Sequence, residues 1–396
     1  MKYIKKDNII LFYFIYLLIG TYAYLILQIN EFPQKYVFTE WLINYEGGYV
    51  NRGLLGQIVF YISNIFNFDL KFIILFLQAS IYTIYFILFY LLLSKIKINF
   101  FWILIIFSPI LFSYPLIELM VLGRKDTFVI SIFLFFSMIN YKTVNSLFFY
   151  FIIFFGVSSF IHEITIFYIF HYLLIIYLHM KLKFKIEIKK NHILGLLTFI
   201  SFLLYLNLYL DNFVTVENIV NSYNYEIITI NSGAFSHLQP TLDSVLLGTL
   251  GHIKFVNVLK YLLIIILNSI PFLFFVKFKK LHNLRYLSTK NVFFIFFLLS
   301  LPVYGLVMDW GRVIHINYNF FIILLLFFFN QNLINLDYIN IKAKKLNPLY
   351  KITILIFICF VFSPDIMSIN KLEYFPLPSQ FIRFLSGTFE KFIELY

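Results

Sequence analysis

The sequence is poor in charge, in small residues and in sulfur. Only 13% of its 396 residues are charged, and it contains 14 glycines and one cysteine against 54 phenylalanines and 30 tyrosines. The single cysteine, Cys359, excludes an intramolecular disulfide and a thiolate metal cluster, because each needs a second cysteine. So few charges exclude an ordinary soluble domain of this size. The shortage of glycine predicts that bulky aromatic side chains, and not small residues, fill the spaces between helices.

Long apolar runs stand where charge is missing. The chain is 61% hydrophobic, its mean hydropathy is +0.87, and apolar runs of about 20 residues recur along it, a length that crosses a bilayer as a helix. We therefore expect an all-α, polytopic integral membrane protein with a single transmembrane helical domain over residues 1–396. The first run extends to about Gln28 without a small-x-small cleavage site, so it predicts a retained helix and not a signal peptide.

Hydropathy predicts eleven membrane spans. The segment 53–66 is too short to cross and is expected to lie on the membrane surface as an amphipathic helix, within a first outer loop over 29–71. A long outer loop is expected over 211–255, and an outer C-terminal tail over 365–396. The expected spans are about 9–28, 72–94, 100–121, 127–141, 146–160, 164–179, 192–210, 256–276, 291–308, 318–333 and 352–364.

The distribution of charge predicts the orientation. Lysines gather in segments that join alternate spans, such as 181–190 and 342–351, whereas only three acids, Asp7, Glu187 and Asp337, fall on that side. Because cytoplasmic segments are enriched in lysine and arginine, this bias predicts that the N-terminus lies inside and the C-terminus outside. The net charge of +12 then reflects orientation and attraction to anionic lipid, and it requires no nucleic acid.

Four charged clusters interrupt the apolar chain, and the expected topology puts all four on the outer side. Isolated charges near lipid are costly, so they are usually kept for a task. We therefore expect one polar site assembled from loops that are far apart in sequence. The clusters are Glu46 to Arg52, Arg124-Lys125-Asp126, His162-Glu163, and Asp309 to His315.

Each cluster also has a purely structural explanation, and that of Glu46 to Arg52 is a loop turn beside interfacial aromatic residues. Asp126 can cap the helix that follows it. His162 and Glu163 either join two short helices or form a buried pair within one long helix, and such a pair is costly unless it is partnered. Asp309 and Arg312 are three residues apart, so they can form an ion pair on one face of a helix.

The layout resembles the bacterial membrane proteins that assemble surface glycans from undecaprenyl-linked sugars, namely O-antigen or capsule repeat-unit polymerases and GT-C-type glycosyltransferases. The shared features are the length, about eleven helices, polar residues gathered on the outer face, and an acid followed by glycine in the first outer loop, here Glu46-Gly47-Gly48. Unlike many GT-C first loops, this one has no second neighbouring acid, and the loop 211–255 has no arginine. The resemblance implies a GT-C-like fold in the bacterial cytoplasmic (inner) membrane.

The resemblance also implies a chemistry, namely glycosyl transfer from an undecaprenyl-(pyro)phosphate-linked donor to a glycan acceptor, with repeat-unit polymerisation as the first choice. Such a reaction needs a carboxylate to take the proton of the acceptor hydroxyl and cations to stabilise the departing pyrophosphate. A GT-C single-sugar transferase is the nearest alternative, and a flippase or transporter of lipid-linked oligosaccharides is the alternative from another class. The expected catalytic carboxylates are Glu46 and Asp309, and the expected substrate-binding residues are Arg52, Arg124, Asp126, His162, Glu163, Arg312 and His315.

Metal dependence stays open at this stage. A divalent metal fits the chemistry but is not required, because arginines can carry the positive charge. No metal ligand is assigned. Aromatic residues in and beside the clusters, Tyr45, Tyr49, Trp310 and Tyr318, could stack on sugar rings.

Overall fold

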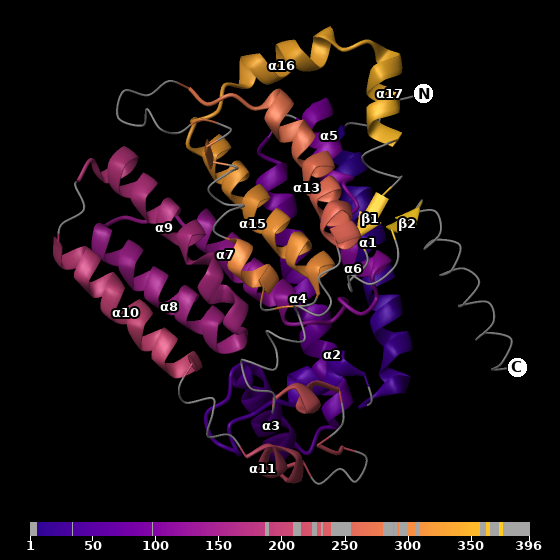
Figure 1. Cartoon of the computed structure of the whole chain (residues 1–396), viewed down its shortest axis with the longest axis vertical. Helices are drawn as coiled ribbons and strands as arrows, with labels where there is room; N and C mark the ends of the chain where they lie inside the picture. The colour runs from indigo at the N-terminus through magenta and orange to yellow at the C-terminus, as the bar shows by residue number, and fades with distance from the viewer. Residues whose placement is uncertain are drawn as a thin grey trace, which may run out of the picture.

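The structure is a computed structural model in which most described residues are helical (Figure 1). It describes residues 6–33, 35–96, 98–186, 190–208, 215–223, 228–230, 233–238, 255–279, 288, 291–292, 300–305, 307, 309–356, 362–364 and 372–374. The longer helices are α1 (Lys6–Gln28), α3 (Gly53–Phe66), α4 (Leu70–Leu93), α7 (Asp126–Met138), α8 (Val144–Ile161), α10 (Lys190–Leu208), α13 (Phe255–Phe275) and α15 (Trp310–Asn330).

Shorter elements complete the chain. The short α-helices are α2 (Tyr36–Thr39), α5 (Phe100–Ile106), α6 (Tyr114–Ile117), α9 (Ile169–Leu178), α11 (Val216–Asn221), α16 (Leu336–Lys345) and α17 (Pro348–Ile356). The 3-10 helices are η1 (Ile29–Glu31), η2 (Glu40–Leu42), η3 (Glu163–Tyr168) and η6 (Gly233–His237), and η4 (His179–Phe184) is a π-helix. Two three-residue strands, β1 (Phe362–Pro364) and β2 (Leu372–Tyr374), pair antiparallel.

Among the described residues, six helical segments are long and apolar enough to cross a membrane, by length and composition. Their outer surfaces carry exposed apolar side chains, such as Phe12 on α1 and Phe76 on α4, which suit contact with lipid. The expected helical fold, with several apolar helices long enough to cross a membrane, is therefore confirmed at this level. The six segments are Asn8–Gln28, Leu70–Leu93, Val144–Ile161, Glu163–Phe184, Val258–Phe275 and Trp310–Asn330.

Several expected spans differ from the helices that form. The expected span 100–121 is broken into α5 and α6, because Pro109 and Pro115 cannot donate the backbone hydrogen bonds of a continuous helix. α15 begins at Trp310, eight residues before the expected start of that span at 318. The last expected span was wrong at its end, since α17 stops at Ile356 and Phe362 begins a strand. Most of 211–255 and 365–396, and half of 291–308, lies outside the described residues, as does Cys359.

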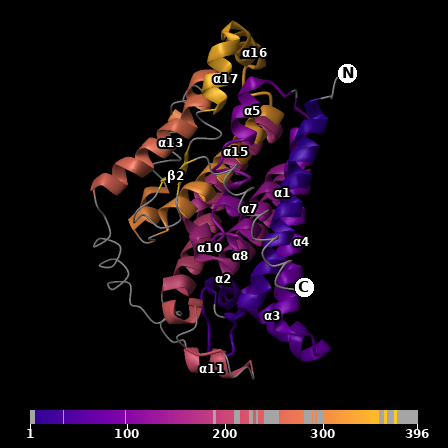
Figure 2. The same ribbon diagram turned by 90° about the vertical axis from the view of Figure 1, so that its right-hand side faces the viewer.

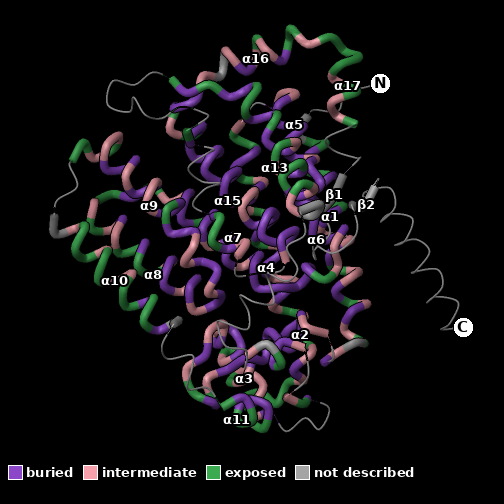
Figure 3. The backbone as a smooth tube through the Cα atoms, viewed as in Figure 1, coloured by how far each residue is buried: buried purple, intermediate pink, exposed green. Residues whose placement is uncertain are grey.

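α15 is the central helix of the bundle. In its apolar, membrane-length stretch 83% of the residues are buried, against 33% in that of α1. Figure 3 shows the contrast between the buried α15 and the exposed outer side of α10. α7 packs against α4, α8 and α15. The ring of Phe133 on α7 stacks on Phe320 of α15, with centroids 4.5 Å apart. Aromatic side chains thus fill the space between these helices, as the shortage of glycine predicts.

The two ends of the molecule differ in composition. α16, with Lys342, Lys344 and Lys345 in its last turn, lies at the same end as the N-terminus (Figures 1 and 2). α2, α3 and α11 lie at the opposite end. There they form a cap, which we define as residues 35–66, 215–223 and 233–238. The backbone N–H of Thr215 donates to the carbonyl of Gly47 at 2.9 Å, and this bond joins the first and second parts of the cap.

Glycine allows the close approach inside the cap. A Cβ atom on Gly56 of α3 would lie 1.8 Å from the carbonyl oxygen of Ile43, which follows η2. Only glycine lets the two backbones come this close. The contact fixes η2 against α3, and η2 carries the side chain around which the site is built.

Candidate functional site

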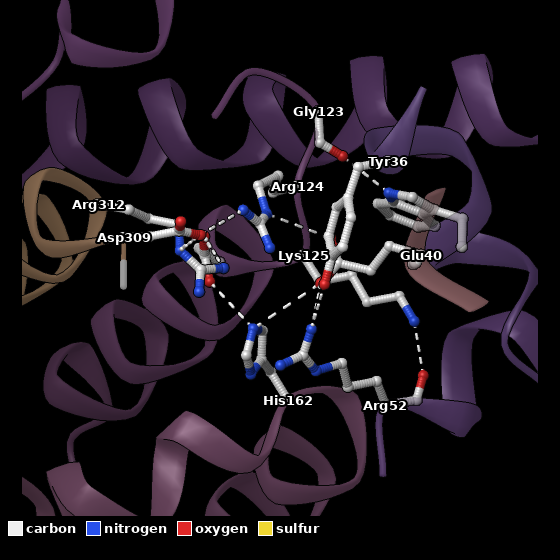
Figure 4. A network of polar contacts seen from close by, with 12 residues as sticks. Tyr36, Glu40, Arg52, Gly123, Arg124, Lys125, His162, Asp309 and Arg312 are labelled. Carbon is white, nitrogen blue, oxygen red and sulfur yellow. Dashed lines mark hydrogen bonds and ion pairs between the residues drawn. The ribbon is translucent and has the colours of Figure 1, made fainter. Parts of the chain in front are cut away.

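The charged clusters meet where the cap covers the end of the helix bundle (Figure 4). α7 begins at Asp126, α8 ends at Ile161, and α15 begins at Trp310. The ends of these three helices meet here. Nine side chains form what we call the ion network: Glu40, Arg52, Arg124, Lys125, Asp126, His162, Glu163, Asp309 and Arg312.

Glu40 of η2 lies at the centre of the ion network and is fully buried. Its Oε1 lies 3.4 Å from Nη1 of Arg52 and 3.8 Å from Nε2 of His162, while Oε2 lies 3.5 Å from Nε of Arg124. Burial alone would raise the pKa of the Glu40 carboxyl, but the positive charges of Arg124 and Arg52 lower it to about 2. Glu40 is therefore ionised and acts as a shared counter-ion for both arginines.

Arg52 connects the cap to the end of α8. It precedes α3 with a left-handed backbone (φ 69°), and its Nε donates to both carboxylate oxygens of Glu163 at 2.8 Å. Its Nη1 also donates to the hydroxyl of Tyr36 at 2.8 Å. His162 lies beside this pair, with Nδ1 3.2 Å from Oε2 of Glu163 and Nε2 3.4 Å from Oδ1 of Asp126. Both members of the costly His162-Glu163 pair thus lie against groups of opposite charge, although Nε2 of His162 makes no hydrogen bond within the described residues.

Arg124 and Arg312 share the carboxylate of Asp309. Its Oδ2 lies 3.0 Å from Nη1 of Arg124 and 3.4 Å from Nε of Arg312. Arg312 also reaches Oδ2 of Asp126 at 3.4 Å, and the guanidinium of Arg124 lies 4.5 Å from the ring centre of Tyr36. Asp126 therefore does more than begin α7: its carboxylate bridges His162 and Arg312, and no side-chain capping bond is made at that helix start within the described residues.

Lys125 is buried between these groups. Its Nζ donates to the carbonyl oxygen of Arg52 at 2.5 Å, and its side chain has no exposed surface. Burial lowers the pKa of Lys125 to about 7, with the neighbouring charge of Arg52 acting in the same direction against that of Glu40. This lysine holds the loop before α7 against the start of α3.

Trp41 fixes the loop that carries Arg124 and Lys125. Its indole Nε1 donates to the carbonyl of Gly123 at 2.7 Å, and Nε2 of Gln78 on α4 donates to the same oxygen at 2.9 Å. Gly123 has a φ of 86°, a conformation that glycine adopts without strain. The cap and α4 therefore both position the two cations that follow Gly123.

Basic and acidic side chains alternate in the ion network. Three arginines and Lys125 face four carboxylates, with His162 among them. Only three side chains retain more than a tenth of their surface: Glu163 (29%), Arg52 (20%) and Asp309 (16%). An external ligand would therefore reach the network beside these three. Within the part of the chain that the structure describes, no three histidine, cysteine, aspartate or glutamate side chains are grouped to hold a metal ion.

Two of the expected site residues lie apart from the ion network. Glu46 is exposed, and its Oε1 accepts a hydrogen bond from Gln57 at 3.0 Å. His315 is buried one turn beyond Arg312 on α15, with Nδ1 2.8 Å from the carbonyl oxygen of Ile110. The other seven expected residues, namely Arg52, Arg124, Asp126, His162, Glu163, Asp309 and Arg312, are brought together.

Three of the four expected sugar-stacking aromatics are engaged with other rings, and the fourth, Tyr318, lines a cavity beside α15. Tyr45 and Tyr49 stack on each other at 5.9 Å, and Trp310 packs edge-on against Tyr261 at 5.5 Å. Glu40 was missed by sequence reasoning. The available signal was an acid within the apolar run Tyr36-Val37-Phe38-Thr39-Glu40-Trp41-Leu42-Ile43, where a lone charge needs a partner.

A cavity of about 50 Å³ lies between α13 and α15, and its polar lining includes Asn268, Tyr304, Asn317 and Tyr318. The described residues that line it do not include any member of the ion network. Comparison with protein-family models, curated proteins and solved structures finds no match to this chain.

Proposed function

We propose that the chain transfers glycosyl groups from an undecaprenyl-(pyro)phosphate-linked sugar to a glycan acceptor, with repeat-unit polymerisation as the first choice. The ion network carries this proposal. It gathers three arginines at the ends of apolar helices, the depth at which a lipid phosphate lies. Arginine binds phosphate with two parallel hydrogen bonds and stabilises its negative charge.

The proposal includes a topology. We propose eleven crossings with the N-terminus in the cytoplasm, of which the six membrane-length segments and the shorter apolar helices α7 and α10 would supply eight. The basic α16 lies at the end with the N-terminus, and the cap lies at the other end (Figure 1). Because cytoplasmic segments are rich in lysine, the cap would face the outer side of the bacterial inner membrane.

The proposed reaction is a displacement at the anomeric carbon. The acceptor hydroxyl oxygen bonds to that carbon, the bond from carbon to the phosphate oxygen breaks, and the pyrophosphate departs on its lipid. The hydroxyl proton passes to a carboxylate. Glu40 and Asp126 are too buried to reach an acceptor, at 0% and 1% side-chain exposure. Glu163 is held through both oxygens by Arg52, so Asp309, between Arg124 and Arg312, is the base that we propose.

A glycan assay in cells tests the function. Asp309→Asn should reduce transfer by about 10²–10⁴-fold, the usual cost of losing a general base. Arg312→Lys should also impair transfer, since lysine cannot make a bidentate contact. Glu217→Gln is the matched control, because this exposed acid lies on α11 of the cap. In a polymerase the Asp309 variant leaves surface lipid with one repeat unit; in a single-sugar GT-C transferase it leaves a truncated unit.

The assay also distinguishes Asp309 from Glu46 as the general base, and glycosyl transfer from other functions. Loss of transfer in Glu46→Gln but not in Asp309→Asn would move the base to the acid beside Gly47. Normal glycan in all of these variants at normal protein levels would contradict glycosyl transfer by the ion network.

One observation favours a transporter as the second candidate. A polar line continues from Arg312 down α15 into the bundle, through His315 and Asn319, whose Oδ1 accepts from the hydroxyl of Tyr85 at 2.6 Å. Ionisable and polar groups inside a bundle often mark a translocation path. Movement of a lipid-linked oligosaccharide across vesicles that contain the purified protein, without bond formation, would establish this alternative.

A further inference from the structure

The carboxylate of Asp309 lies where an anionic ligand would bind. One oxygen, Oδ2, is shared by two arginines from distant segments, at 3.0 Å from Nη1 of Arg124 and 3.4 Å from Nε of Arg312. The arginine side chains are 6% and 2% exposed, whereas that of Asp309 is 16% exposed. Two buried guanidinium groups that converge on one oxygen form a geometry suited to a phosphate.

The side chain of Asp309 does not cap α15, although the residue stands at the N-cap position. It is the residue before the first turn of α15, where an aspartate ordinarily accepts a hydrogen bond from the backbone N–H groups of that turn. Within the described residues its side chain makes no such bond, and its backbone is not extended (φ −81°, ψ 59°). The carboxylate is turned toward the two arginines instead.

Asp309 is also the carboxylate that these two arginines can release. Their other acidic partners are Glu40 and Asp126, with 0% and 1% side-chain exposure, and removing either from between its cations would leave a buried charge unpaired. Asp309 borders solvent, so its charge can be hydrated once it leaves. Because the carboxylates already offset the charge of the arginines, an incoming anion gains most when a carboxylate moves away.

We propose that Asp309 is an internal stand-in for a phosphate group, and that a phosphate-bearing ligand binds by displacing its carboxylate from Arg124 and Arg312. The phosphate oxygens then bond to both guanidinium groups, and Asp309 moves to the exposed side of the network. This inference rests on the proposed function for the bearer of the phosphate. The chemistry recognised is the phosphate itself, whether free or on a lipid.

Displacement would couple binding to the availability of the base. Burial alone would raise the pKa of Asp309, but Arg312 and Arg124 together lower it below its ordinary value, so the resting carboxylate is a weak base. When phosphate takes the two cations, the carboxylate loses that stabilisation and accepts a proton more readily. An acceptor hydroxyl would thus meet an active base only after the donor is bound.

Phosphate binding to the purified full-length protein in detergent tests this inference without any glycosyl transfer. The probes are inorganic pyrophosphate and, in a second arm, undecaprenyl phosphate in the micelles. The readout is tryptophan fluorescence, since Trp310 adjoins Asp309 and Trp41 contacts Gly123. Asp309→Asn should bind pyrophosphate at least about 10-fold more tightly than the wild type. In the wild type the carboxylate occupies the site, and the apparent affinity falls in proportion to the fraction of molecules whose site is free. A gain with the lipid alone would identify a lipid-borne phosphate.

Three further variants control the result. Glu217→Gln removes the same charge from the exposed cap and should leave the affinity unchanged. Asp309→Glu keeps the carboxylate and should bind no more tightly than the wild type. Arg312→Lys keeps the charge and should weaken binding by about 10-fold.

Two outcomes would overturn the inference: equal affinity of wild type and Asp309→Asn, or an equal gain in Glu217→Gln, which would reveal a general effect of charge. If Asp309→Asn fails to fold, unaltered binding by Arg312→Lys refutes the site independently. Tighter binding in Asp309→Asn without any glycosyl transfer by the wild type would refute the proposed function and leave this site intact.

Discussion

Oε2 of Glu40 lies 3.5 Å from Nε of Arg124, and the two side chains are 0% and 6% exposed. This contact joins η2 of the cap to the loop that precedes α7. It is one of the interactions through which the cap is held on the bundle, and the contact of Glu40 with His162 at the end of α8 is another. The stability of the cap and the geometry of the arginines are therefore set by the same carboxylate.

Replacement of Glu40 should destabilise the protein strongly. Glu40→Ala leaves Arg52 and Arg124 without a shared counter-ion, and breaking a buried ion pair typically costs about 3–5 kcal/mol. Thermal unfolding in detergent measures the change. Glu217→Ala, on the exposed face of α11, should shift the unfolding temperature little. An unchanged unfolding temperature in Glu40→Ala would show that Glu40 does not hold the cap.

Lys125 should make stability depend on pH above neutrality. Burial lowers its pKa to about 7 in the folded state, whereas an unfolded lysine titrates near 10.4. Between these values the unfolded chain binds a proton that the folded chain lacks, so the free energy of unfolding rises with pH. Lys125→Met should flatten that rise between about pH 7 and 10, as measured by chemical denaturation in detergent. Lys344→Met, on the exposed end of α16, should retain the wild-type slope, and an equal slope in Lys125→Met would show that Lys125 is not the titrating group.

Gly56 and Gly195 provide a matched pair of glycine-to-alanine substitutions. A Cβ on Gly56 would lie 1.8 Å from the carbonyl oxygen of Ile43, whereas one on Gly195 would meet no atom within 4 Å. Gly56→Ala should force η2 away from α3 and destabilise the protein by about 1–3 kcal/mol, a typical cost of overpacking. Gly195→Ala should be neutral or stabilise α10 by up to about 1 kcal/mol. Equal unfolding temperatures for the two variants would contradict the close approach in the cap.

Cysteine labelling of intact cells tests the proposed orientation. In a Cys359→Ser background, cysteines at Glu46 and Glu217 should react with an impermeant reagent, because both positions are exposed on the cap. Cysteines at Lys95 and Lys344, which are also exposed, should react only after the membrane is permeabilised. Labelling at Lys344 and protection at Glu46 in intact cells would reverse the orientation.

Local features of the site followed from the sequence. Asp309 and Arg312 form the ion pair that their three-residue spacing allows. His162 and Glu163 mark the junction of two helices, one of the two arrangements expected for them, since α8 ends at Ile161 and η3 begins at Glu163. Both outcomes depend on neighbours along the chain and on the cost of a charge in an apolar run, and these are properties that a single sequence contains.

The choice among acids in the first loop could not be made from the sequence. Glycines beside Glu46 favoured it as the reactive acid, but its carboxylate faces Gln57 on the exposed side of the cap. Glu40 points inward instead, because the approach of Gly56 to Ile43 fixes η2 against α3. That approach, and the meeting of Glu40 with Arg124, are tertiary contacts that local pattern does not specify.

The ion network also imposes an order on biosynthesis. Glu40, Arg52, Arg124 and Asp126 belong to the first third of the chain, whereas Asp309 and Arg312 come after about three quarters of it. Domains and segments generally fold from the N-terminus as they are made, so these early charges enter the membrane region before their last partners exist. A ribosome that stops before codon 309 releases a chain in which Arg124 lacks Asp309 and Asp126 lacks Arg312, and such incompletely paired chains are those that cellular proteases remove. Insertion of α15 is thus the event that completes the protein.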